Sequence, residues 1–393
     1  MLNSSEYCKV VDNGQPSTLI VFSSAGIPQG KFSGTRAFSN PKMNYIYLNA
    51  PDNNWYIGEI PGLGKDVGAI ADSLLLKCKL LGTVDLYTYG GSMGGYGAIL
   101  YGSLLNAKKI FSTGVESTLG IQGGFFNIHC KSHFRSLDSK YLNLSKVISN
   151  NNSNILCLFG EFSFVDLESA NVLANKNGVN VKTIRNEEHS IPPLIDYYFG
   201  VSNVAFSYFY NDDIDVMDGL FGNILDDYSM SNALYRMKCL KKDVSQELSH
   251  YGNCKSSTNL SYLLFNNSII NKRVGKLDDA FNALRKSVFI NDGNYVALYN
   301  LADQYNRLRN FGLGVFYSNR SLSYVIPGFR PLYNASISLA NAHLGIGDYH
   351  KAEYVLSDLD LRMTNSAKSN PHLKVRIDSI SKRLSEFRFS HTS

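Results

Sequence analysis

Short apolar runs separated by polar turns dominate the first 200 residues of the chain. The runs lie at residues 19–22, 45–48, 84–89, 109–115, 155–159 and 179–184. Between the second and third runs, residues 67–78 carry apolar side chains at helical spacing, with charged residues mostly off that face. Short apolar runs are typical of strands buried on both faces, and their alternation with helices predicts a doubly wound, mostly parallel sheet of the α/β class.

From residue 259 to residue 361 the pattern changes to helix-length segments that repeat. A turn followed by a small residue occurs three times, and the small residues Ala280, Gly314 and Ala352 are 34 and 38 residues apart. Such units cannot bury their apolar faces alone, so they stack into an array of helical hairpins. The spacing resembles that of tetratricopeptide repeats.

These patterns divide the chain into three expected regions. We expect an α/β domain over residues 1–200 and a connector with helical pieces over residues 201–258. An all-α repeat domain over residues 259–393 follows, with a charged capping helix near its end.

Composition narrows the class of protein. The chain has 393 residues, of which 44% are hydrophobic and 18% charged, and its formal net charge of +5 is spread over scattered Lys and Arg. We therefore expect a globular protein with no nucleic-acid partner. The apolar stretch at residues 18–25 is too short and wrongly flanked for a signal peptide or an integral membrane segment, so a cytoplasmic location is expected. The six cysteines form no C-x-x-C pair, so neither disulfides nor a metal site is expected.

The third apolar run ends in Gly90-Gly91-Ser92-Met93-Gly94, a G-x-S-x-G motif followed by a helix-like segment. A serine held on a sharp strand-to-helix turn leaves no room for side chains two residues to either side, which explains the glycines at 90 and 94. The motif also occurs by chance in glycine-containing loops. Its position between a strand and a helix favours a nucleophile elbow with Ser92 as the nucleophile.

An acid and a base follow Ser92 in the order that a serine triad needs. Asp166 comes after the run that ends at Phe159, where a turn would hold its carboxylate over the sheet edge. The alternatives are an ordinary helix-capping aspartate at this position, or Glu161 as the acid. His189 follows the run that ends at residue 184, and its neutral imidazole is the usual base for a serine hydroxyl, although a surface-loop histidine has the same signature.

Two backbone donors are needed for the oxyanion of such a reaction. Met93, directly after the nucleophile, is expected to supply the first. Ser24 and Ala25, in the loop after the first run, are the candidates for the second. Small residues also suit a plain strand-to-helix turn, so that alternative stays open.

The elbow, Asp166 and His189 together resemble the α/β-hydrolase superfamily over about residues 15–200. The resemblance implies a serine acyl-enzyme mechanism, with Ser92 as nucleophile, His189 as base and Asp166 as orienting acid. The chain lacks the H-G-G-G run and the long apolar lid of common lipases, which argues against long-chain lipids. In layout it is similar to hydrolase-fold proteins that modify O-acetyl groups on bacterial surface polysaccharides or glycoproteins.

Sugar recognition favours aromatic faces and polar groups in the cleft. Trp55, Arg36 and His129 are therefore the candidate substrate-binding residues, with His129 in a glycine-led insertion. For Trp55, the chain's only tryptophan, a partly buried loop anchor is at least as good an interpretation.

Three functions follow from these observations. The first is an esterase that removes O-acyl, chiefly O-acetyl, groups from carbohydrate without a cofactor. The second is a polysaccharide O-acetyltransferase that uses the same triad with acetyl-coenzyme A as donor. The third is a non-catalytic interaction protein whose repeats bind a protein partner or mediate self-association.

Overall fold

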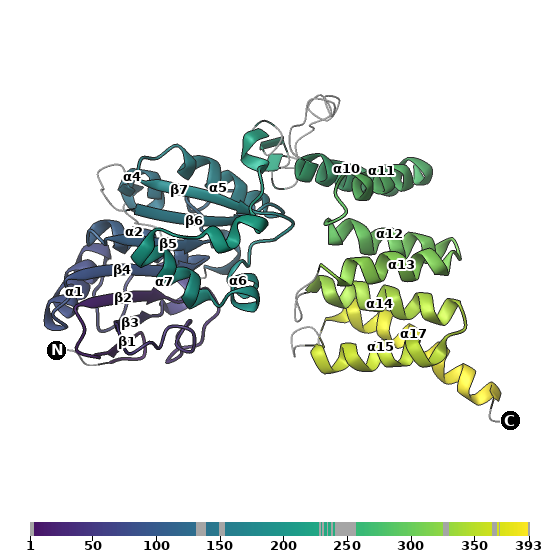
Figure 1. The fold of residues 1–393 in the computed structure, drawn as a ribbon, viewed down its shortest axis with the longest axis horizontal. Helices are drawn as coiled ribbons and strands as arrows, with labels where there is room; N and C mark the ends of the chain where they lie inside the picture. The colour runs from purple at the N-terminus through teal and green to yellow at the C-terminus, as the bar shows by residue number, and fades with distance from the viewer. Residues whose placement is uncertain are drawn as a thin grey trace. The chain divides into compact units, whose positions relative to one another are not determined.

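The computed structural model describes residues 4–130, 139–148, 154–227, 257–324, 330–363 and 370–391, and a few single residues between these ranges. The chain divides into two compact units, Met1–His250 and Tyr251–Ser393 (Figure 1). Each unit is described by itself. Most of residues 228–256, in the second half of the expected connector, lie outside the described residues.

The first unit is built on one seven-stranded sheet with the order β1-β3-β2-β4-β5-β6-β7. Six of its strands are parallel, and only β1 pairs in the antiparallel direction, with β3. The strands are β1 (Cys8–Val11), β2 (Ser17–Phe22), β3 (Asn44–Leu48), β4 (Asp85–Gly91), β5 (Lys109–Thr113), β6 (Asn154–Gly160) and β7 (Val179–Ile184). The mostly parallel sheet expected from the apolar runs is confirmed.

Helices cover both faces of this sheet. They are α1 (Val67–Leu80), α2 (Met93–Leu104), α3 (Phe125–His129), α4 (Leu144–Ile148), α5 (Phe164–Ala174), α6 (Pro192–Tyr198) and α7 (Val201–Asn211). Short 3-10 turns lie at Pro51–Asn53, Ser139–Leu142, Asp215–Leu220 and Ile224–Asp227. The aligned residues Ile20 and Ile46 share a core with α1, α2 and α5. On the other face, Tyr87 and Phe111 meet aromatic side chains of α7.

This doubly wound arrangement matches the α/β-hydrolase fold. Parallel strands buried on both faces and crossover helices explain why the strands appear in the sequence as continuous apolar runs. The one unexpected strand is β1, which is only four residues long and partly exposed at the sheet edge, so it has no apolar run to reveal it.

The second unit is all-helical, as expected. Its described helices are α10 (Ser257–Arg273), α11 (Leu277–Ile290), α12 (Tyr295–Arg307), α13 (Phe311–Leu322), α14 (Arg330–Gly345), α15 (Tyr349–Arg362) and α17 (Pro371–His391). Consecutive helices run as antiparallel pairs (Figure 1). The three small residues that mark the repeats, Ala280, Gly314 and Ala352, are all buried on the second helix of a pair.

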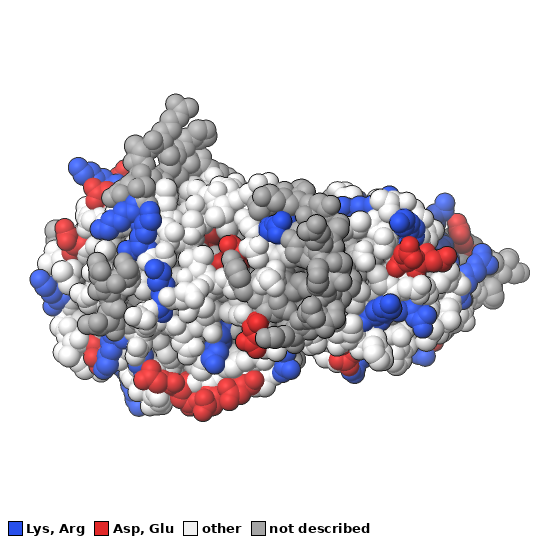
Figure 2. All heavy atoms as spheres, turned by 90° about the horizontal axis from the view of Figure 1, so that it is seen from above, with Lys and Arg blue, Asp and Glu red and all other residues white. Residues whose placement is uncertain are grey.

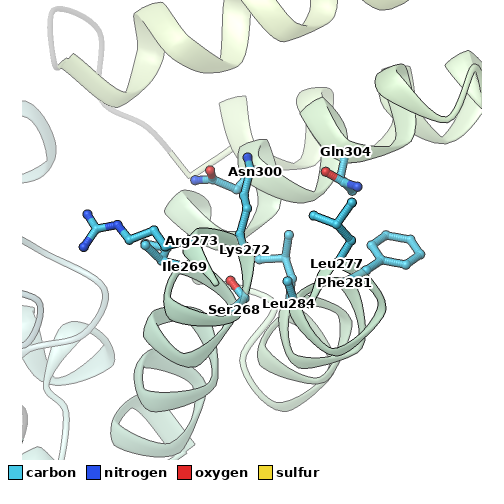
Figure 3. Close-up of a pocket in the computed structure, with 10 residues that line it drawn as sticks. Ser268, Ile269, Lys272, Arg273, Leu277, Phe281, Leu284, Asn300 and Gln304 are labelled. Atoms are coloured by element: carbon cyan, nitrogen blue, oxygen red, sulfur yellow. The ribbon is translucent and has the colours of Figure 1, made fainter. Parts of the chain in front are cut away.

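A pocket of about 360 Å³ opens between α10, α11 and α12 in the second unit (Figure 3). Leu277, Phe281 and Leu284 of α11 supply apolar side chains to it. Lys272 of α10 and Gln304 of α12 add polar groups. Apolar and cationic side chains therefore share one concave surface.

On the face drawn in Figure 2, Lys and Arg of the described part are scattered among uncharged residues, whereas Asp and Glu gather along the lower edge of the view. Within the described residues, no helix combines the length and the apolar character that a bilayer crossing requires.

Candidate active site

Ser92 occupies the sharp turn between β4 and α2. Its backbone has φ 54° and ψ −121°, a conformation that non-glycine residues rarely adopt. A Cβ at Gly90 would lie 2.1 Å from the carbonyl oxygen of Gly94, and a Cβ at Gly94 would lie 2.2 Å from that of Phe22. The glycines are therefore required because backbone packs on backbone, and the Ser92 side chain is left at the carboxyl edge of the sheet.

The side chains of Ser92, His189 and Asp166 meet at this edge. The Nε2 atom of His189 lies 2.8 Å from Oγ of Ser92, and its Nδ1 atom lies 2.9 Å from each carboxylate oxygen of Asp166. If Nδ1 donates its proton to Asp166, Nε2 is free to accept the hydroxyl proton of Ser92. Ser92 and Asp166, which lie 97 and 23 positions before His189 in the sequence, are thus joined to it in one hydrogen-bonded chain.

Asp166 is fully buried and lies in the first turn of α5 rather than in the turn before it. The side chain that β6 and α5 aim at the imidazole is this carboxylate, not that of Glu161. Glu161 instead accepts hydrogen bonds from the Thr183 hydroxyl at 3.1 Å and from the Ile224 backbone at 3.0 Å. Glu161 therefore anchors the chain after β7.

The environment of His189 changes its basicity in two opposing directions. Burial lowers the pKa of the imidazole, whereas the charge and hydrogen bond of Asp166, together with Glu116 and Glu188, raise it. The net effect is a pKa above the ordinary value for histidine. Carboxylates that face the ring stabilise the imidazolium that forms when a serine is deprotonated.

Met93 and the loop after β2 are the expected sources of the two backbone N–H donors for an oxyanion. Met93 is the first residue of α2, where helical N–H groups lack partners within the helix. Of the two candidates in the loop after β2, the Ser24 N–H donates to the hydroxyl of Ser33 at 3.3 Å, and the Ser24 hydroxyl donates to the Gly91 carbonyl at 3.0 Å. Both residues line the cavity beside Ser92, but the Ser24 N–H is already engaged, so the Ala25 N–H is the better candidate for the second donor.

A cavity of about 630 Å³ opens in front of Ser92 and His189. Of the three candidate substrate residues, His129 lines it. Trp55 does not, because its side chain is fully buried and packs edge-on against Phe126 at 5.3 Å between ring centroids. The prediction for Trp55 is therefore wrong, and its alternative as a buried anchor is correct. Arg36 is exposed and is not among the residues that line this cavity, so its role in substrate binding stays a prediction.

Other lining residues gave no signal in the sequence. Ser190, Pro193 and Asp196 reach the cavity from the loop after His189 and from α6. Phe125 reaches it from α3, in the same glycine-led insertion as His129, and its ring stacks on the His189 imidazole. The sequence did indicate that this insertion could line the substrate cleft, but it did not indicate which of its side chains would contact the catalytic residues.

Comparison with known proteins gives structural similarity only. No protein-family model and no curated protein sequence matches the chain. A mutant capsule O-acetyltransferase of Neisseria meningitidis serogroup A in complex with CoA is 18% identical, with a TM-score of 0.38 over 50% of this chain and 91% of that chain. A thermophilic esterase from Thermogutta terrifontis is 16% identical, with a TM-score of 0.35 over 51% of this chain and 92% of that chain.

A fluorophosphonate-binding serine hydrolase of Staphylococcus aureus is 17% identical, with a TM-score of 0.36 over 50% of this chain and 85% of that chain. These values are too low to transfer a reaction or a substrate. The functional argument therefore depends on the geometry of the chain's own residues.

Proposed function

We propose that the first unit is a serine acyl-transfer enzyme that hydrolyses O-acyl, chiefly O-acetyl, esters of carbohydrate. The observation that supports this proposal is the continuous hydrogen-bonded chain from Ser92 through His189 to Asp166, with the Ser92 hydroxyl facing a cavity of about 630 Å³. The base lies within hydrogen-bonding distance of both the nucleophile and the orienting acid, which is the arrangement that activates a serine hydroxyl.

In the proposed reaction, Nε2 of His189 takes the hydroxyl proton as Oγ of Ser92 attacks the ester carbonyl. The N–H groups of Met93 and Ala25 stabilise the negative oxygen of the tetrahedral intermediate. The bond between the acyl carbon and the sugar oxygen then breaks, and the imidazolium gives its proton to that oxygen. Water, deprotonated by His189, attacks the acyl-enzyme. The bond between the acyl carbon and Oγ of Ser92 then breaks, the imidazolium returns its proton to Oγ, and the carboxylic acid leaves.

The cavity wall is mainly apolar and carries a few polar side chains. Ser33, Ser190 and Asp196 offer hydroxyl and carboxylate groups, while Phe38 and Tyr89 offer aromatic surface. Sugars present both hydroxyl groups and apolar C–H faces, so a mainly apolar wall with a few polar groups is compatible with an acetylated sugar.

A sugar hydroxyl in place of the attacking water would make the same acyl-enzyme an O-acetyltransferase with acetyl-coenzyme A as donor. The two reactions share the triad and differ only in donor and acceptor. Supplying acetyl-coenzyme A and capsular oligosaccharides separates them, because a Ser92-dependent mass gain of one acetyl group on the oligosaccharide would replace hydrolysis as the assigned reaction.

The second unit is proposed to bind a protein partner or a second copy of the chain through its repeats, which we infer to be tetratricopeptide-like. Stacked hairpins and the pocket with Lys272, Phe281 and Gln304 support a docking role. The proposed location is the cytoplasm, in line with the dispersed cysteines. The alternative is that the whole chain has a non-catalytic role, and the following experiment tests it.

The experiment measures acetate release from p-nitrophenyl acetate and from O-acetylated oligosaccharides by the full chain and by Ser92→Ala. We expect release by the wild-type chain, a preference for the oligosaccharide in kcat/KM, and background rates for the variant. Equal rates for the two proteins would refute catalysis by this site. Release from p-nitrophenyl acetate alone would refute the carbohydrate assignment.

A further inference from the structure

Glu116 is a buried carboxylate beside the triad that the proposed mechanism does not use. It follows β5 by three residues, and only 2% of its surface is exposed. Its Oε2 atom accepts a hydrogen bond of 2.8 Å from the backbone N–H of Phe126. Burying a carboxylate is costly, so one that is retained in a core is expected to make contacts that need it.

The backbone that Glu116 holds is packed directly against its carboxylate. A Cβ at Gly124 would lie 2.2 Å from Oε1 of Glu116, so only glycine allows the chain to approach this closely. Gly124 is the residue before α3, and Phe125 and Phe126 are the first residues of that helix. The carboxylate therefore fixes the start of α3.

Phe125 is the residue that this anchor presents to the active site. Its ring stacks on the imidazole of His189, with 3.8 Å between the centroids and 24° between the planes. It also lines the cavity in front of Ser92. The ring closes one face of the imidazole and limits the rotations that would carry Nε2 away from Oγ of Ser92.

We propose that Glu116 is a positioning residue that holds the start of α3 and thereby fixes the Phe125 ring against the His189 imidazole. The inference deepens the proposed function, on which its kinetic part rests. Other contacts also hold α3, since Asn127 donates to the Ile121 carbonyl at 2.8 Å and Asn53 donates to the His129 carbonyl at 3.2 Å. Glu116 is the contact that lies next to Phe125.

Several charged or titratable groups surround this arrangement. Asp166, Glu116 and Glu188 act on His189, and their negative charges all raise its pKa. Glu116 is in turn influenced by Asp166 and His189, and burial raises its pKa to about 7. Tyr96 and Tyr235 also lie within electrostatic reach of Glu116.

Two substitutions separate the charge of Glu116 from its hydrogen bond, and a third removes the ring that Glu116 is proposed to position. Glu116→Gln keeps an acceptor oxygen and removes the charge, whereas Glu116→Ala removes both. Phe125→Leu removes the ring and leaves the backbone N–H groups in place. Phe126→Leu is the matched control, because the Phe126 ring packs on Trp55 rather than on the imidazole.

The readout that needs no activity is the Cε1 proton of His189, observed by NMR in protein with carbon-13-labelled histidine and assigned from its loss in His189→Asn. A proton above an aromatic face resonates upfield. We expect Phe125→Leu and Glu116→Ala to move this resonance downfield, while Phe126→Leu leaves it unchanged. Glu116→Gln should keep the upfield position and lower the pKa read from the titration of the same proton.

The kinetic readout is kcat/KM for acetyl esters. We expect Glu116→Ala and Phe125→Leu each to lower it by roughly 10- to 100-fold, as small displacements of reacting groups do. The double variant should lose little more than either single variant, because both remove the same positioning. An unmoved Cε1 resonance in Glu116→Ala, or losses that multiply in the double variant, would overturn the proposal.

If Glu116→Ala does not fold, Phe125→Leu and Glu116→Gln still test the proposal. An unmoved resonance in Phe125→Leu, or a downfield resonance in Glu116→Gln, would contradict the proposal. Failure of the proposed function is distinguishable, because an unreactive wild-type chain with intact NMR responses refutes the catalysis and leaves the positioning by Glu116 in place.

Discussion

Asp166 contacts His189 through both carboxylate oxygens, each 2.9 Å from Nδ1, while being fully buried itself. A buried carboxylate in this position selects one tautomer of the imidazole and stabilises its protonated form. The relationship makes Asp166, rather than the neighbouring Glu161, the residue on which the basicity of His189 depends.

Replacing Asp166 by Asn should lower kcat for acetyl-ester hydrolysis by about 10³- to 10⁴-fold, because the amide favours the wrong tautomer of the imidazole. Steady-state rates with p-nitrophenyl acetate measure the effect. Glu161→Gln is the matched control, since Glu161 bonds to Thr183 and Ile224 instead. A larger loss in the control than in Asp166→Asn would assign the acid to Glu161.

The rate of acylation should depend on pH through His189. The base acts in its neutral form, so the rate falls as pH drops through the imidazole pKa. Because the carboxylates around the ring raise this pKa, the wild-type midpoint should lie above the ordinary value of about 6.5. In Asp166→Asn the midpoint should move to lower pH, and a shift to higher pH in a stopped-flow pH profile would contradict the assigned electrostatics.

Gly94→Ala should destabilise the first unit, because the new Cβ would lie 2.2 Å from the Phe22 carbonyl oxygen and the backbone has no room to give. A loss of about 1–3 kcal/mol or more in the free energy of unfolding is expected, as for other overpacked sites. Urea denaturation measures it. Gly68→Ala, where the nearest atom lies at 3.4 Å, is the control and should be neutral or stabilising.

Trp55→Ala tests the corrected role of the tryptophan. Loss of a fully buried indole should cost about 3–5 kcal/mol in the free energy of unfolding. The fraction that remains folded should keep its KM for O-acetylated oligosaccharide. A selective rise in KM with unchanged stability would restore Trp55 as a sugar contact.

The sheet and the elbow were predictable because their physical causes are local. Strands buried on both faces must be apolar throughout, and Gly90 and Gly94 are required by backbone contacts within a few residues of Ser92 or on the adjacent strand. The order of Ser92, Asp166 and His189 then indicated the triad. The helical unit was predictable because its small residues recur at a spacing that is visible in the sequence.

What the sequence did not reveal depends on contacts without a local pattern. Trp55 lies among polar loop residues, so no local pattern decided between a sugar contact and a buried anchor that packs on Phe126. Glu116 and Phe125 are joined through a turn that has no periodicity. Asp166 was expected before a helix and lies within its first turn, because a helix boundary shifts by a residue or two without changing the pattern.

Intact-mass measurement after treatment with a fluorophosphonate probe tests the central claim most directly, because such probes phosphonylate a serine only when a neighbouring base activates it. We expect a single adduct, mapped by peptide sequencing to Ser92, that disappears in Ser92→Ala and forms far more slowly in His189→Asn. An unmodified wild-type chain, or an adduct at another residue, would contradict the account.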